Sequence, residues 1–424
     1  MKVLFLYPNH EGYFRCPVGL TLIMTVVENA GHDVKLFDTT FMNSDDNQDN
    51  SKREEAGLVK PVTLDNYFNK KSTSEIESEW IQFVEDFKPD LIATTIVEDA
   101  YTYAHRLLGL AKSVHDVPVV VGGSMPTVVP RVMIENPNID YLVEGEGEVA
   151  FKDLIDALIK DGDVSQVANL WYQENGVTKN TGLVKYLDMD EIPFQKLDFW
   201  DDKHFTKPYD GELRVTGFFE GSRGCMHKCH YCINRAFQVF QEEAGKVRRN
   251  KSPRRIIDEV KAIHKERNFN LIMFTDDNFL GRQPRELDEF FKLWKEEIDL
   301  PYWINTCIET VNDHNLPQLK ASGCVGIAIG LETGSDWVRR NLLLKGKMDN
   351  KFYMEKFALM AKYKIRSTAN NMLGIPGEYE EDFFETIKLN KQIRELDPEL
   401  TSFDVSFMAP YLSLIHISEP TRLR

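Results

Sequence analysis

The chain has 424 residues, of which 42% are hydrophobic and 28% are charged, and this composition excludes a disordered or collagen-like protein. Its 67 acidic side chains outnumber the 51 basic ones and give a formal net charge of −16. Because such a chain is repelled by phosphate backbones, we expect it not to bind nucleic acid. This length predicts two or three domains, each with a core of its own.

The apolar runs are short. The longest near the N-terminus covers residues 3–7, which is too short for the core of a signal peptide, and no run approaches the roughly 20 residues of a membrane span. We therefore expect a cytoplasmic protein without a membrane partner. Six cysteines are too few for a disulfide framework in a chain this long, and the clustering of three of them indicates metal binding in a reducing compartment.

Residues 1–182 alternate short apolar runs with amphipathic stretches. The apolar runs are KVLFLY, DVKLFD, DLIATTIV and VPVVVGG. This alternation predicts an α/β domain with a Rossmann-like, doubly wound sheet, which closes with a hairpin turning at Asn175-Gly176. Within it, the highly charged segment Asp45 to Lys71 is expected to be a solvated insertion.

Residues 183–212 show no clear period and are predicted to be an ordered linker. From residue 213 to 412 the βα rhythm resumes, with amphipathic helices such as Ser252 to Arg267 and Arg285 to Ile298. Six strand candidates predict a partial (β/α)6 barrel of the TIM type: RVTGFFEG, NLIMFTD, YWINTCI, VGIAIG, RSTANNML and SFDVSFM. The tail at 413–424 breaks the pattern and is interpreted as non-native sequence.

The sharpest chemical signal is GCMHKCHYC, which places Cys225, Cys229 and Cys232 directly after a predicted strand. Three thiolates can hold three irons of a 4Fe-4S cluster and leave the fourth iron open to a substrate. The alternative is a zinc knuckle in which His227 or His230 completes a tetrahedron. Two other cysteines, Cys307 and Cys324, fall in or beside predicted strands and are expected to be small core residues.

This loop resembles the cluster loop of the radical SAM superfamily, which has the same cysteine spacing and an aromatic residue, here Tyr231, before the last cysteine. The resemblance implies that the three cysteines are cluster ligands. It also implies that the open iron binds the amino and carboxylate groups of S-adenosylmethionine (SAM). An electron, expected from a flavodoxin or ferredoxin, would then cleave SAM to a 5'-deoxyadenosyl radical.

Three further motifs, FTDDNF, GLETGS and NMLGIPGE, follow predicted strands of the barrel, at the ends where barrels carry their chemistry. By the resemblance, SAM is contacted by Tyr231, Asp277, Glu332 and Gly374. Taken one at a time, these motifs favour a plainer interpretation, with Glu332 a carboxylate at a helix N-terminus and Gly374 part of a simple turn, and it is their joint order that supports the resemblance. Lys345 matches a basic residue of many relatives but is also typical of a surface lysine, and we assign it no role.

The N-terminal domain resembles the cobalamin-binding domain that precedes some radical SAM barrels. The resemblance is carried by PVGLTLIMTVVENAGHDVKLFD, DLIATTIVED, VVVGGSMPT and DYLVEGEGE. Glycine loops at the carboxyl edge of a doubly wound sheet suit a corrinoid, because they let backbone approach it. The expected cobalamin contacts are Thr94, Thr95, Gly122, Gly123, Gly145, Glu146 and Gly147. The Asp-x-His-x-x-Gly motif of many cobalamin proteins is absent, so the lower axial ligand is unassigned, and a Rossmann-like domain that has lost cobalamin is the alternative.

Together the two resemblances imply a cobalamin-dependent radical SAM enzyme. We expect it to methylate an unactivated carbon of a small or medium-sized metabolite through a 5'-deoxyadenosyl radical and methylcobalamin. Two alternatives stay open: a radical SAM cyclase or rearrangement enzyme without methyl transfer, and a non-catalytic corrinoid-binding protein. Relatives of the barrel continue beyond the sixth strand, so we expect a C-terminally truncated barrel with little turnover. The sequence identifies neither a catalytic residue nor the substrate.

Overall fold

A computed structural model describes residues 1–9, 16–42, 55, 60, 62, 67–160 and 163–409. Most of the predicted insertion at Asp45 to Lys71, and all of the tail at 413–424, lie outside the described residues. The chain forms two compact units. The first comprises Met1–Tyr186, Ile192–Val215 and Phe240–Gly245; the second comprises Leu187–Glu191, Thr216–Val239 and the chain from Lys246 on.

The first unit is built on a seven-stranded sheet with the order β2-β1-β3-β4-β5-β6-β7. Its first five strands in this order are parallel, and β6 and β7 are added antiparallel. The bounds are β1 Lys2–Tyr7, β2 Asp33–Asp38, β3 Leu91–Thr95, β4 Val119–Gly122, β5 Tyr141–Val143, β6 Leu170–Glu174 and β7 Val177–Asn180. The predicted hairpin is confirmed, since Asn175 and Gly176 turn between β6 and β7 with positive φ angles of 52° and 75°.

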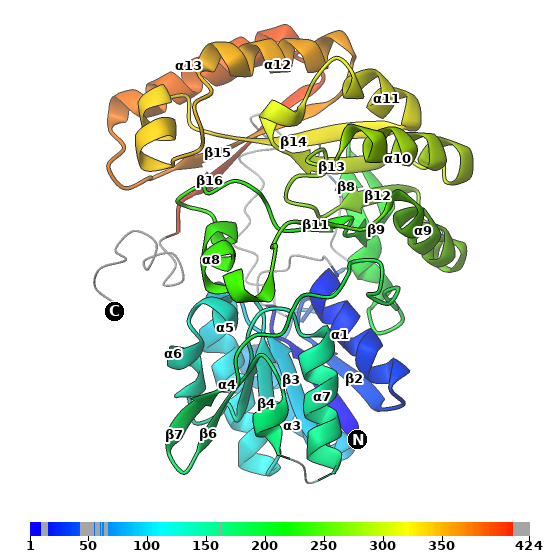
Figure 1. The fold of residues 1–424 in the computed structure, drawn as a ribbon, viewed down its shortest axis with the longest axis vertical. Helices are drawn as coiled ribbons and strands as arrows, with labels where there is room; N and C mark the ends of the chain where they lie inside the picture. The colour runs from blue at the N-terminus through cyan, green and yellow to red at the C-terminus, as the bar shows by residue number, and fades with distance from the viewer. Residues whose placement is uncertain are drawn as a thin grey trace. The chain divides into compact units, whose positions relative to one another are not determined.

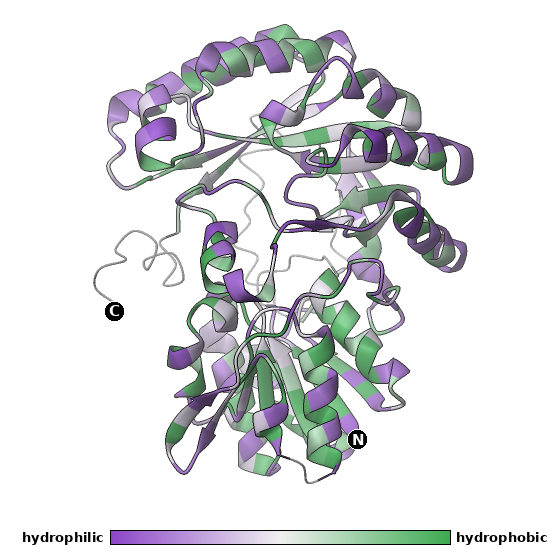
Figure 2. Ribbon diagram, in the orientation of Figure 1, coloured by the Kyte–Doolittle hydropathy of each residue, from purple (hydrophilic) through white to green (hydrophobic). Residues whose placement is uncertain are grey.

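Helices cover both faces of this sheet, as a doubly wound fold requires. One face packs against α3 (Thr73–Phe87) and α4 (Tyr101–Val114), where Trp80 is fully buried among Leu4, Leu6 and Ile92. On the other face Phe5 stacks on Phe151 of α7, and α7 lies beside α1 (Figure 1). The remaining bounds are α1 Val18–Asn29, α5 Ser124–Val128, α6 Pro130–Ile134 and α7 Glu148–Ile159. Figure 2 shows the central strands of this sheet as mostly hydrophobic, and β1, β3 and β4 are accordingly buried on both faces.

A second sheet has the order β16-β15-β14-β13-β12-β9-β8, and all of it belongs to the second unit except β8 and the first residues of β9. From β9 to β16 all neighbours are parallel, and β8 pairs antiparallel with the beginning of β9. The bounds are β8 Thr206–Tyr209, β9 Glu212–Phe219, β12 Leu271–Phe274, β13 Tyr302–Thr306, β14 Cys324–Glu332, β15 Ser367–Leu373 and β16 Thr401–Phe407. Strands β16 and β8 are the two edges, so the sheet is open, and the predicted partial (β/α)6 barrel is confirmed.

Amphipathic helices connect these strands, and each parallel step is a βα unit. Their bounds are α8 Ile233–Phe240, α9 Pro253–Arg267, α10 Pro284–Glu297, α11 Asn315–Ser322, α12 Asn350–Lys362 and α13 Glu380–Leu396. Helix α9 begins where the Ser252 hydroxyl accepts a hydrogen bond from the backbone N–H of Arg255 and Pro253 occupies the first turn. An aromatic cluster of Phe274, Phe290 and Trp294 joins α10 to β12.

Part of the predicted linker belongs to the first unit. Trp200 donates its indole N–H to the Thr21 hydroxyl at 2.9 Å, and the His204 ring lies 2.6 Å from the Asp38 carboxylate. No helix in the described part of the chain is both long enough and apolar enough to span a bilayer.

Candidate functional site

The three clustered cysteines lie in a loop between β10 (Ser222–Arg223) and α8. The loop is held by donors to its backbone carbonyls: the Gln238 amide donates to Cys225 at 2.5 Å and to His227 at 2.9 Å. At its start, Gly224 has φ +75°, and a Cβ there would lie 2.7 Å from the backbone oxygen of Val247. The glycine of the GCMHKC motif is therefore required by the backbone itself.

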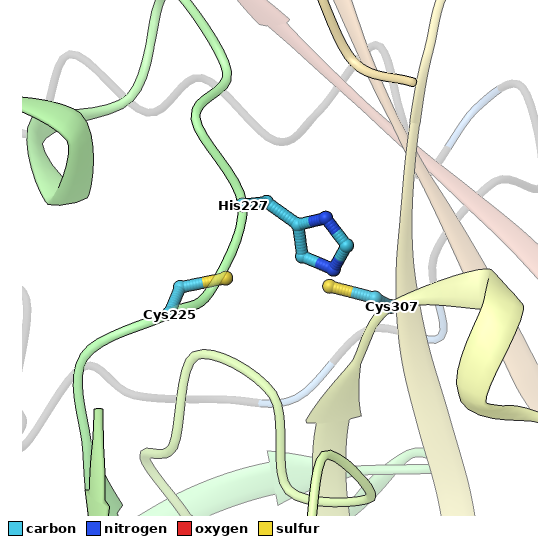
Figure 3. A group of neighbouring side chains, drawn as sticks. All are labelled: Cys225, His227 and Cys307. Atoms are coloured by element: carbon cyan, nitrogen blue, oxygen red, sulfur yellow. The ribbon is translucent and has the colours of Figure 1, made fainter. Parts of the chain in front are cut away.

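Among the described residues, one group of three possible metal ligands has all its ligand atoms within 4.8 Å of one another: Cys225, His227 and Cys307 (Figure 3). Cys229 and Cys232 are outside this group. A zinc knuckle brings four ligand atoms to about 2.0–2.3 Å from one ion, and so within about 4 Å of one another. The three loop cysteines are not packed around such a point. Three thiols in one loop therefore suit the wider 4Fe-4S cluster better than a single zinc.

The expectation that Cys307 is a core residue is wrong. It is half-buried, directly follows β13, and contacts the thiol of Cys225. This contact lowers the pKa of Cys225 and raises that of Cys307. The reason is topological: β13 ends at the same edge of the sheet as the cysteine loop, and sequence distance conceals this. Cys324, by contrast, is fully buried as expected.

The other two thiols of the loop are held in their protonated form. Burial raises the pKa of Cys229 to about 11, although the nearby Lys345 ammonium acts in the opposite direction. Burial also raises the pKa of Cys232. Because only thiolates bind metal, loading the loop must release these protons, and cluster affinity should rise with pH.

A half-buried polar triad joins the cysteine loop to β14. The Glu332 carboxylate accepts hydrogen bonds from the Tyr231 hydroxyl at 2.8 Å and from the Lys345 ammonium at 2.6 Å, and Lys345 also donates to Tyr231 at 3.0 Å. Burial opposes the charge of Lys345, but Glu332 and Tyr231 outweigh it and raise the pKa of Lys345 well above its usual value. Lys345, to which we assigned no role from the sequence, is thus a fixed cation in the site.

Glu332 itself has an unusual backbone. Its φ is +68°, and the register of β14 against β15 shifts between Gly330 and Glu332. A bulge of this kind redirects a side chain at the end of a strand, and a non-glycine residue with positive φ costs of order 1 kcal/mol or more. The strain supports a functional role for this carboxylate.

The loop after Glu332 is braced by Arg339, whose side chain is fully buried. Its guanidinium donates to the backbone oxygen of Thr333, to Asn350 at 2.9 Å and to Asp336 at 2.6 Å. It also lies 4.5 Å from the centre of the Tyr353 ring. The sequence contains no signal for this role, because an isolated arginine is usually a surface residue.

The remaining predicted SAM residues lie at neighbouring strand ends. Asp277 follows β12 and faces the cysteine loop, where it interacts electrostatically with Cys225 and Cys232. Gly374 follows β15, and its φ of +76° presents the backbone N–H groups of residues 374 and 375 to the Glu378 carboxylate at 3.0 and 3.1 Å. A hydrogen bond joins Tyr231 to Glu332 directly, whereas Gly374 makes no hydrogen bond to either of them in the described part of the chain.

The predicted cobalamin residues all lie at the carboxyl edge of three adjacent strands of the first unit. Thr94 and Thr95 end β3, Gly122 ends β4 and Gly123 follows it, and Gly145, Glu146 and Gly147 follow β5. Gly123 has φ +105°, and a Cβ there would lie 2.5 Å from the Thr95 hydroxyl.

Sequence reasoning missed the residue that joins two of these loops. The Thr127 hydroxyl donates to the backbone oxygen of Gly123 at 2.7 Å and accepts from the backbone N–H of Gly145 at 3.0 Å. The loops after β4 and β5 are thereby fixed to each other.

Comparison with known families decides what the two units are. Residues 219–389 match the model of the Radical SAM superfamily, and residues 63–155 match that of the B12 binding domain. The chain therefore joins a B12 binding domain to a radical SAM domain. The recognition made from the sequence is confirmed. The cysteine loop lies within the radical SAM domain, and all seven predicted cobalamin residues lie within the B12 binding domain.

Individual proteins resemble the chain over most of its length. It is 27% identical to an uncharacterized methyltransferase, PH0819, of Pyrococcus horikoshii, covering 97% of this chain and 81% of the relative. It is 23% identical to the anaerobic magnesium-protoporphyrin IX monomethyl ester cyclase of Rubrivivax gelatinosus, covering 84% and 63%. The radical SAM methyltransferase TsrM from Kitasatospora setae, solved with tryptophan and a SAM analogue, superposes with a TM-score of 0.68 at 17% identity, covering 95% of this chain and 72% of TsrM. The last comparison establishes the shared fold.

Proposed function

We propose that this protein is a cobalamin-dependent radical SAM methyltransferase that methylates a carbon of a small or medium-sized metabolite. One observation carries the proposal: a loop of three cysteines, tied by Tyr231 to the Glu332–Lys345 pair, lies at the strand ends of a radical SAM domain in a chain that also carries a B12 binding domain. The similarity to a methyltransferase over 97% of the chain supports it.

In this proposal Cys225, Cys229 and Cys232 hold a 4Fe-4S cluster, and the strand ends around Glu332 hold SAM. When bound, the cluster supplies the electron that cleaves SAM, and cobalamin carries the methyl group. The Glu332 carboxylate would accept a hydrogen bond from the amino group of SAM, which would compete with Lys345 for the same oxygen. Lys345 would remain a cation beside the SAM carboxylate, because its charge is stabilised even without a ligand.

The residues of the B12 binding domain have a different task, which is to let a large cofactor approach. Gly123 and Gly145 expose backbone at the ends of β4 and β5, and Thr127 fixes the distance between these two loops. Holding cobalamin there would orient its reactive face. We also propose a flavodoxin or ferredoxin as electron donor and a location in the cytoplasm.

A second candidate function is ring closure without methyl transfer. It is favoured by the similarity to the magnesium-protoporphyrin ester cyclase, which extends over both domains. Both functions use the same cofactors, so only the fate of the SAM methyl group separates them.

The first experiment is to measure iron, zinc and cobalt after anaerobic expression with cobalamin, in the wild type and in a Cys225→Ala/Cys229→Ala/Cys232→Ala variant. We expect about four irons per chain in the wild type, lost in the variant, and about one cobalt in both. About one zinc and no iron would contradict the proposal.

The second experiment is to incubate the reduced, loaded protein with SAM. A methyltransferase should produce S-adenosylhomocysteine as the methyl group moves to cobalamin, which changes the visible absorption of cobalamin. Formation of 5'-deoxyadenosine without S-adenosylhomocysteine would favour ring closure instead.

A further inference from the structure

A short segment that follows α8 belongs to the B12-binding unit. Residues Phe240–Gly245 pack with the first unit, although the chain before and after them belongs to the second. Hydrogen bonds to the end of the first unit hold the segment: the backbone N–H of Tyr186 donates to Ala244 at 3.0 Å, and the Lys185 ammonium donates to the backbone oxygen of Glu243 at 2.7 Å.

Within this segment, Gln241 is buried, with only 5% of its surface exposed. The Tyr186 hydroxyl donates to its side-chain oxygen Oε1 at 2.5 Å and so fixes the orientation of the amide. The amide nitrogen Nε2 is buried and has no hydrogen-bond partner among the described residues. A buried donor without an acceptor costs about 1–3 kcal/mol, and an acceptor on a bound ligand would remove this cost.

The unpartnered nitrogen lies directly over the predicted cobalamin loop. A Cβ built on Gly145 would be 2.4 Å from Nε2 of Gln241, and Gly145 has φ +79°. Any side chain at position 145 would therefore displace the Gln241 amide. The backbone N–H of Gly145 also donates a hydrogen bond to the Thr127 hydroxyl, which holds this loop in place next to Gln241.

We propose that Gln241 binds the corrinoid, by donating a hydrogen bond from Nε2 to an oxygen at the corrinoid's periphery. The chemistry required is an uncharged acceptor or a phosphate oxygen, and a corrinoid offers both: amide carbonyls on the ring side chains and one phosphate in the nucleotide tail. Tyr186 is a positioning residue, because it holds Oε1 and leaves Nε2 directed at the ligand. The inference rests on the proposed function, since it requires that the first unit bind cobalamin.

Gln241 lies close to the cluster loop in the sequence. Only α8 separates it from Cys232, the last cysteine of the cluster loop. One continuous stretch of chain therefore carries a predicted cluster ligand at one end and a corrinoid contact at the other.

The test measures the dissociation constant of hydroxocobalamin for the anaerobically prepared full chain by absorbance titration. Gln241→Ala removes the donor, and Gln241→Glu keeps the size but replaces the amide by an acceptor; both should weaken binding about tenfold or more. Tyr186→Phe should weaken it by less, because the amide remains but is no longer oriented. Gln173→Ala is the matched control. Gln173 lies on β6, where its amide donates to the backbone oxygen of Ile134 at the end of α6, and its loss should leave the affinity unchanged.

Iron content and thermal unfolding of each variant show whether the fold is intact. If Gln241→Ala unfolds, the isosteric Gln241→Glu decides the question. Binding as tight as wild type in both Gln241 variants would overturn the inference while leaving the proposed function in place. A wild-type chain that binds no cobalamin would instead overturn the proposed function.

Cobinamide, which lacks the nucleotide tail and its phosphate, distinguishes the two acceptors. If Gln241→Ala weakens cobinamide and cobalamin by the same factor, the acceptor is a ring amide. If it weakens cobalamin alone, the acceptor is the phosphate.

Discussion

The two units both place their candidate sites at the carboxyl ends of parallel strands, but with different chemistry. At the edge of the B12-binding sheet the contacts described above are mainly neutral: the Thr127 hydroxyl, the Gln241 amide and backbone exposed at glycines, with Glu146 the charged residue among the predicted cobalamin contacts. At the edge of the radical SAM sheet they are ionic, with Glu332 bound to Lys345 and Asp336 bound to Arg339. The first edge is suited to a large ligand recognised by shape, and the second to a small charged ligand recognised by its ammonium and carboxylate groups.

Both sites follow the same topological rule, but they are suited to different kinds of ligand. We therefore expect substitutions at the two edges to have different effects. A charge removed from the radical SAM edge should cost stability or SAM affinity according to its burial. A methyl group added to the B12-binding edge should cost stability according to the space around it.

The largest effect is expected for Arg339→Met. The substitution leaves Asp336, Asn350 and the Thr333 carbonyl without their shared donor, and should lower the free energy of unfolding by about 3 kcal/mol. Urea unfolding measures it. The control is the adjacent Arg340→Met, because Arg340 is 44% exposed and 3.9 Å from Asp336; it should change stability by no more than about 0.5 kcal/mol. Equal losses of stability in the two variants would show that burial of the guanidinium does not determine its contribution to the free energy of unfolding.

The next effect separates two adjacent glycines of the B12-binding edge. Gly123→Ala forces a methyl group to within 2.5 Å of the Thr95 hydroxyl at a φ of +105°, and should cost about 2 kcal/mol and reduce bound cobalt. Gly122→Ala should leave the free energy of unfolding unchanged, because the nearest atom, the Val143 oxygen, would be 3.8 Å away. Thermal unfolding and cobalt content report both. If the two variants are equally stable, the space around each glycine does not determine the stability of this edge.

A smaller effect is expected for Tyr231→Phe. The variant loses the hydroxyl that donates to Glu332 and accepts from Lys345, so the triad is less well fixed and SAM affinity should fall about fivefold, or about 1 kcal/mol. Equilibrium binding of SAM to the iron-loaded protein measures it. Tyr353→Phe is the control, since the Tyr353 hydroxyl is buried but has no hydrogen-bond partner in the described chain. A similar loss of SAM affinity in the control would show that the loss does not depend on the hydrogen bonds of the triad.

Much of the fold follows from the sequence because the βα alternation is strong in both units. The predicted helices Ser252 to Arg267 and Arg285 to Ile298 agree with α9 and α10 to within a residue at each end. Serine and proline at the start of α9 mark its boundary locally, and local signals of this kind need no knowledge of distant contacts. The domain boundaries and the assignment of individual residues to cofactors remain predictions.

The site is less predictable where a residue acts through a distant partner. Lysine and arginine are usually surface residues, and only the folded chain shows Arg339 buried against Thr333 and Lys345 half-buried against Glu332. Cys307 was expected in the core, because nothing near it in the sequence indicates that β13 ends beside Cys225. Motifs reveal residues that act with their sequence neighbours, whereas supporting residues are revealed by topology.

The smallest effect tests whether charge on the radical SAM unit matters at its exposed surface. Arg254 and Lys261 donate to Glu297 and lower its pKa to about 2. A carboxylate with a lowered pKa stabilises the fold above its unfolded pKa of about 4.5, and this contribution is lost as the pH falls toward 2. Glu297→Gln should therefore lower the Tm by no more than about 2 °C at pH 7, because exposed pairs are well screened, and by less below pH 4. The adjacent Glu296→Gln is the control and should leave the Tm unchanged. A loss for Glu297→Gln as large as that of Arg339→Met would contradict the view that ionic contacts stabilise this unit only where they are buried.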